Sequence, residues 1–121
     1  NPVDIWGPAM VHGIEKAHRD AIEAVMDDPN IDACIVVLVV VDEFGRTPLD
    51  FFVEMAHKYP DKPLYVTFSG IKERMEEAKA YLEPRGIPTY PYIEQPFEVL
   101  SILNQARISM ERAQRETQPK G

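Results

Sequence analysis

The chain has 121 residues, of which 45% are hydrophobic, and its formal net charge is −7. This length fits one domain with a hydrophobic core of its own. The acidic balance argues against nucleic acid or an anionic membrane as the main partner, because both are bound by clustered Lys and Arg. The longest apolar run, residues 33–41, is far shorter than the ~20 residues that span a bilayer.

The single cysteine and the first residues of the chain indicate the cellular compartment in which the protein is found. Cys34 lies inside the apolar run, so we expect a small core residue, no disulfide framework and a reducing environment. No basic start followed by an apolar stretch marks a signal peptide. The chain starts at Asn1 rather than at Met. We therefore predict a cytoplasmic protein whose native chain extends upstream.

The first 41 residues predict a strand, a helix and a second strand. Residues 3–6 favour a short strand that ends at a Gly-Pro pair. Residues 34–41 are β-branched on both faces without alternation, which is typical of a central strand covered by helices on both sides. Between them we expect a helix, stopped by residues 27–30, with one apolar stripe made of Val11, Ile14, His18, Ala21, Ile22 and Val25.

The middle of the chain predicts a loop, a helix and a strand. A polar loop covers residues 42–46. Thr47 is a suitable N-cap with Pro48 at the first helical position, and the helix is expected to run to about Tyr59. Residues 64–68 form the next expected strand, followed by a turn at residues 69–70.

The last third predicts a helix, an edge strand and a long helix. Residues 89–92 lie between prolines and favour a short strand near a sheet edge. Pro96 is expected to open a helix that runs to about Arg112, and residues 114–121 are expected to fray. The preceding helix ends at residues 84–86, and its inner face is formed by Ile71, Met75, Ala78 and Leu82.

Strands that alternate with helices imply right-handed crossovers and a parallel sheet. The sequence therefore predicts an α/β fold with three layers: a parallel sheet of about four strands with helices on both faces. We expect the domain to cover residues 1–113 and residues 114–121 to form a flexible tail.

In an open parallel sheet, ligands bind beyond the carboxyl ends of the strands. This rule selects four loops: residues 6–10, 42–47, 69–70 and 92–95. In the second loop, Gly45, Arg46 and Thr47 precede a helix N-terminus, where free backbone N–H groups attract an anion. Arg46 can add a charge-assisted bond to a phosphate, although Thr47 as a simple helix cap explains the same pattern.

Other polar residues offer weaker candidates. Asp42 and Glu43 could hold Mg²⁺, but without a metal they would repel a phosphate in the same loop. His18 falls on the inner stripe of its helix, His57 in the last turn of its helix, and His12 near a helix start where it could approach a ligand. The sequence has no Cys/His cluster with metal spacing, no P-loop and no nucleophile elbow, so we predict no self-contained catalytic machinery.

An ordered set of short motifs resembles a known family. The chain opens with Asn1-Pro2-Val3-Asp4-Ile5 and, before the apolar strand, has Asp28-Pro29-Asn30-Ile31-Asp32-Ala33. It continues with Lys62-Pro63-Leu64-Tyr65-Val66, Gly86-Ile87-Pro88-Thr89-Tyr90-Pro91 and Gln95-Pro96-Phe97. This order resembles the flavodoxin-like domain of the NDP-forming acyl-CoA synthetases, which are related to the succinyl-CoA synthetases.

The resemblance implies a role within a larger enzyme. In that family a phosphohistidine links acyl-CoA, phosphate and nucleotide chemistry, and this domain packs against the domain that carries it. A helix N-terminus of the domain helps to hold the phosphate, and by position Gly45, Arg46 and Thr47 match it. ATP or ADP, CoA and Mg²⁺ are implied for the full-length enzyme, with an ATP-grasp domain or subunit and a CoA-binding domain as partners, and none bound by this fragment itself.

The chain also departs from the family pattern. The family's small-residue loop is replaced by Asp42 to Arg46, and His12, His18 and His57 do not match the phosphohistidine motif. The usual first strand and helix, which precede the Asn-Pro-Val-Asp segment, are missing. We therefore expect an exposed sheet edge, and with it either self-association of the fragment or marginal stability.

Two other functions stay open. The fold could serve as a non-catalytic interaction or regulatory module, which the missing glycine-rich loop favours. A receiver-like or flavin-binding domain is a third hypothesis, suggested by the acidic pair after a strand. No later strand ends in a phosphoacceptor Asp, however, and residues 69–70 are too short for a flavin phosphate loop.

Overall fold

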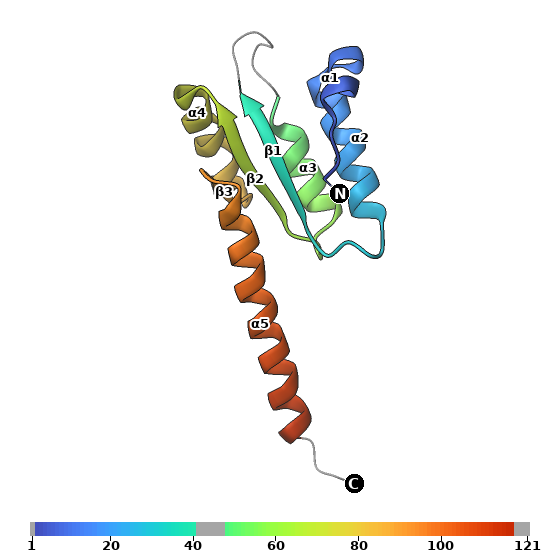
Figure 1. The fold of residues 1–121 in the computed structure, drawn as a ribbon, viewed down its shortest axis with the longest axis vertical. Helices are drawn as coiled ribbons and strands as arrows, with labels where there is room; N and C mark the ends of the chain where they lie inside the picture. Colours follow the sequence, from blue (N-terminus) through green and yellow to red (C-terminus); the bar gives the residue numbers. More distant parts are fainter. Residues whose placement is uncertain (1, 41–47, 118–121) are drawn as a thin grey trace.

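The computed structural model describes residues 2–40 and 48–117. In these residues the chain forms three strands, five α-helices and one 3₁₀ turn (Figure 1). The order is α1 (Trp6–His12), α2 (Ile14–Asp27), β1 (Cys34–Val40), α3 (Asp50–Lys58), β2 (Leu64–Gly70), α4 (Lys72–Leu82), η2 (Glu83–Arg85), β3 (Thr89–Tyr90) and α5 (Glu94–Thr117).

The strands form one parallel sheet in the order β1-β2-β3. Cys34 pairs with Leu64 and Val40 with Gly70, so β1 and β2 are in register along their whole length. α3 connects β1 to β2, and α4 connects β2 to β3, so both connections step across the sheet in the same direction. Because such connections are right-handed, both helices lie on the same face of the sheet. The predicted α/β class and parallel sheet are confirmed, and the arrangement is that of a flavodoxin-like fragment that lacks part of its sheet.

The hydrophobic core lies between this face and three helices. Alternate residues of β1 and β2 point into it, with Leu38 and Val66 fully buried. α3 contributes Phe51 and Phe52, whose rings stack with their centroids 4.2 Å apart. α2 and α4 close the core from either side, mainly through Ile22, Met26, Ala78 and Leu82. Apolar residues thus recur on one side of α2, α3 and α4 because only that side is buried against the sheet.

The opposite face of β1 is largely uncovered, which corrects one prediction. Val37 and Val39, which alternate with the core residues, are 44% and 37% exposed. β1 also lies at an edge of the three-stranded sheet, whereas β2 is the central strand. The run of residues 34–40 is therefore a strand, as predicted, but the described helices cover only one of its faces.

The N-terminal segment differs from the predicted strand. Residues 2–5 have no regular structure, and Trp6 already belongs to α1. The expected single helix is divided at Gly13, which has φ 89° and ψ 151°. Such a backbone conformation suits glycine and interrupts the helical ladder, so α1 and α2 meet at an angle near the carboxyl end of the sheet (Figure 1).

β2 is longer than predicted because Gly70 completes it. Ser69 and Gly70 pair with Val39 and Val40 rather than forming a turn. Gly70 has φ 136°, and a Cβ atom at this position would lie 2.1 Å from the carbonyl oxygen of Val40. Only glycine allows the two strand ends to approach this closely.

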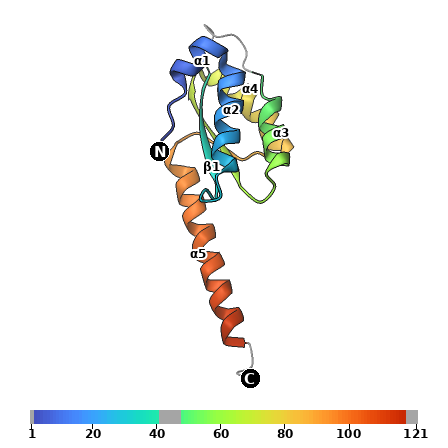
Figure 2. The ribbon, with the colours of Figure 1, turned by 90° about the vertical axis from the view of Figure 1, so that its right-hand side faces the viewer.

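The final helix is long and extends away from the domain. α5 runs from Glu94 to Thr117, past the predicted end near Arg112, and Pro96 is its one residue classed as buried among those described. It continues beyond the amino ends of β1 and β2 (Figures 1 and 2). The predicted boundary at residue 113 falls inside this helix, and the division into domain and tail stays a prediction.

Candidate functional site

An open cleft of about 800 Å³ lies where α1 meets α2, beside the residue that leads into α3. The α1–α2 junction is at the carboxyl end of the sheet (Figure 1), which is where open parallel sheets bind ligands. The cleft is lined by Ala9, Met10, His12, Gly13, Ile14, Glu15, Lys16, Arg19, Asp20 and Pro48.

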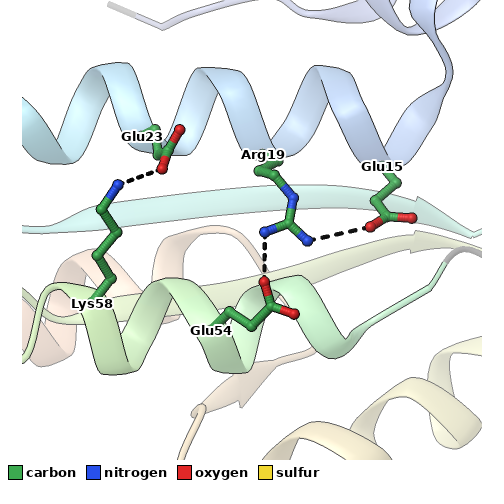
Figure 3. Close-up of polar contacts among 5 residues, drawn as sticks. All are labelled: Glu15, Arg19, Glu23, Glu54 and Lys58. Carbon is green, nitrogen blue, oxygen red and sulfur yellow. Dashed lines mark hydrogen bonds and ion pairs between the residues drawn. The ribbon is translucent and has the colours of Figure 1, made fainter.

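The cations of the cleft are already paired. Lys16 Nζ donates to Asp20 Oδ2 at 2.6 Å, one helical turn along α2. Arg19 donates from Nη1 to Glu54 Oε2 at 2.6 Å and from Nη2 to Glu15 Oε1 at 3.3 Å (Figure 3). These bonds, above all the one to Glu54, raise the pKa of Arg19. An incoming anion would therefore compete with carboxylates at these side chains.

The same pairs connect α2 to α3. Figure 3 shows Arg19 reaching from α2 to Glu54 of α3, and Lys58 of α3 reaching back to Glu23 of α2. The chain positions are 35 residues apart in both cases. The two bridges link the middle and the end of α3 to α2, and exposed pairs of this kind add little stability.

The first turn of α3 is held from its other side by α4. The Tyr81 hydroxyl donates to Asp50 Oδ1, and this bond is the main reason why the pKa of Tyr81 is raised. The Arg85 guanidinium lies 3.8 Å from the centroid of the Tyr81 ring. The Asp50 carboxylate thus faces α4, and no side chain caps the helix at its N-cap residue, Leu49.

The predicted phosphate-binding residues Gly45, Arg46 and Thr47 lie outside the described residues, and so do Asp42 and Glu43. The helix that they were expected to open begins later than predicted. Pro48 precedes α3 instead of occupying its first turn, and the helix starts at Asp50. The assignment of residues 45–47 to phosphate therefore stays a prediction.

The histidines take different positions. His12 lines the cleft from the last turn of α1. His18 is buried, as expected, with Nδ1 2.8 Å from the Ile14 carbonyl oxygen and its ring near Phe51 and Phe52; burial lowers its pKa, and the hydrogen bond only partly opposes this. His57 lies in the last turn of α3.

The remaining candidates do not form a reaction centre. Burial raises the pKa of Cys34 to about 11, which leaves on the order of 0.1% thiolate at pH 8. Within residues 2–40 and 48–117, no group of three or more His, Cys, Asp or Glu residues is arranged to hold a metal. Gln95, in the last predicted loop, has a buried Oε1 without a hydrogen-bond partner in the described part of the chain.

Sequence reasoning found the correct end of the sheet but missed the cleft. Residues 6–10, predicted to be a loop after a strand, form most of α1 and contribute Ala9 and Met10 to the cleft wall. Residues 69–70 belong to β2. The signal that could have located the cleft was Gly13, since a glycine within a helical pattern marks a break where two helices diverge.

Among the helices of the described residues, none combines the length and the apolar character needed to cross a membrane. No family model matches the chain. No solved structure matches it either.

A curated protein does match. The chain is 32% identical over 100 residues to acetate–CoA ligase [ADP-forming] II of Archaeoglobus fulgidus. The match covers 83% of this chain, so it includes most of the described fold. It covers 15% of the archaeal protein, so the chain spans a small part of the length of this relative.

The parallel order, the register of β1 and β2 and the helices between the strands define an α/β domain of the flavodoxin-like class. Together with the match over 100 residues, they identify its family. The chain belongs to the superfamily of ADP-forming acyl-CoA synthetases, as its sequence motifs predicted.

Proposed function

We propose that the chain is the flavodoxin-like domain of an NDP-forming acyl-CoA synthetase, an acid–thiol ligase. In this role it docks on the phosphohistidine domain of the same protein and offers the N-terminal end of α3 to the phosphate. The likeness to an ADP-forming acetate–CoA ligase carries the proposal. The chain is a part of such an enzyme and is not active alone.

The position of α3 supports the phosphate role. Its first turn lies at the carboxyl end of the parallel sheet, beside the cleft at the α1–α2 junction. Leu49 supplies no capping side chain, so the first N–H groups of the helix rely on other acceptors. A phosphoryl group is an acceptor that the helix dipole also favours, and Gly45, Arg46 and Thr47 lie in the sequence just before Pro48 and Leu49, which lead into this helix.

The cleft at the α1–α2 junction is better suited to contact another protein domain than to bind a nucleotide. Lys16 and Arg19 are each neutralised by carboxylates within hydrogen-bond distance, so they add little net positive charge for a di- or triphosphate. We therefore assign ATP or ADP, Mg²⁺ and CoA to other domains of the full-length enzyme, including an ATP-grasp portion. Each supplies nucleotide or thioester chemistry there, while this domain positions the phosphate.

Arg46→Ala in the full-length protein tests this role. The rate of acyl-CoA formation from acid, CoA and ATP should fall about 10- to 100-fold, because a charge-assisted contact to phosphate is lost. Phosphorylation of the enzyme by labelled ATP, followed on an acid-labile gel band, should fall in parallel. Lys79→Ala, which removes a cation from the last turn of α4, should leave both rates within twofold of the wild type.

A second function competes with this one. The paired cations of the cleft and the absence of a small-residue loop before α3 favour a non-catalytic interaction or regulatory module derived from the same fold. Unchanged kinetics in Arg46→Ala would contradict phosphate binding. If association between this domain and the rest of the enzyme were also lost after substitution of an exposed cleft residue, such as Met10→Asp, the module would be supported.

A further inference from the structure

We draw no further inference here: the strongest candidate, the apolar surface formed by the uncovered face of β1 and the exposed side of α5, carries none because nothing in the structure shows what covers it.

Discussion

The body of the domain, formed by the sheet with α2, α3 and α4, buries its apolar side chains, whereas α5 leaves most of its apolar side chains exposed. In the body, α2, α3 and α4 bury their apolar sides against one face of the sheet, and Phe51, Phe52 and Leu82 are fully buried. α5 has nine apolar residues among its 24, a smaller share than in these three helices, and only Pro96 is buried. The body is therefore stabilised by contacts within this chain, whereas α5 and the free face of β1 expose apolar side chains such as Leu103, Val37 and Val39.

This difference predicts where substitutions should change the stability of the chain. The hydrophobic effect stabilises a residue in proportion to the apolar area that it removes from water. Equal truncations in the two regions should therefore have very different effects on the free energy of unfolding of the isolated chain.

The largest contrast is expected between two phenylalanines. Phe52→Ala removes a fully buried ring from the core and should lower the free energy of unfolding by about 3–5 kcal/mol. Phe97→Ala removes a ring from α5 that is 59% exposed and should cost less than about 1 kcal/mol. Urea denaturation followed by circular dichroism measures both, and similar losses would contradict the division into two regions.

A glycine pair gives the next largest effect. Gly70→Ala places a Cβ 2.1 Å from the Val40 carbonyl oxygen at a positive φ and should destabilise the chain by about 2–3 kcal/mol. Gly7 lies in α1 without a positive φ, and the position that a Cβ would take there is open space. Gly7→Ala should therefore be neutral or stabilise by up to about 1 kcal/mol. Thermal unfolding of both variants checks the sign.

A pH series tests the burial of His18. Burial lowers the pKa of His18 in the folded chain, whereas the unfolded chain takes up this proton near pH 6.5. Stability should accordingly be complete above pH 6.5 and should fall as the pH drops below it, by at most about 1.4 kcal/mol per pH unit. His18→Leu should flatten this slope between pH 7 and 5, and an unchanged slope in this variant would contradict the contribution of the buried His18.

The smallest effect is expected at the bridge between α2 and α3. Arg19 and Glu54 are 31% and 57% exposed, so their pairing should contribute only about 0.5 kcal/mol. A double-mutant cycle with Arg19→Met and Glu54→Gln isolates this coupling energy. It should shrink in 0.5 M salt, and a coupling above about 2 kcal/mol would show that the bridge supports the fold far more than its exposure implies.

Much of the fold could be predicted from the sequence because local patterns agree with it. The stripe through Met75, Ala78 and Leu82 predicted the buried side of α4, and the prolines around β3 predicted an edge strand. The N-terminal segment was mispredicted because its few β-favouring residues cannot form a strand without a neighbour to pair with. The strand ending at Gly70 was cut short because a glycine usually signals a turn, and its pairing with Val40 is a long-range contact.

The candidate site was harder to predict for the same reason. The rule for parallel sheets led to their carboxyl end, but the cleft depends on the break at Gly13 and on residues such as Arg19 and Glu54, which are 35 positions apart. The family motifs, by contrast, were readable from the sequence, since they are contiguous, and the match to an archaeal ligase confirmed them.

The sequence by itself determined the class of fold, the family and most helices and strands, because hydrophobic periodicity, caps and short motifs act over a few neighbouring residues. The tertiary structure alone decided which face of β1 is covered, where the cleft lies and that α5 extends from the domain. These features depend on which segments meet in space, and the same β-branched run can be buried on one face or on two according to the elements that pack against it.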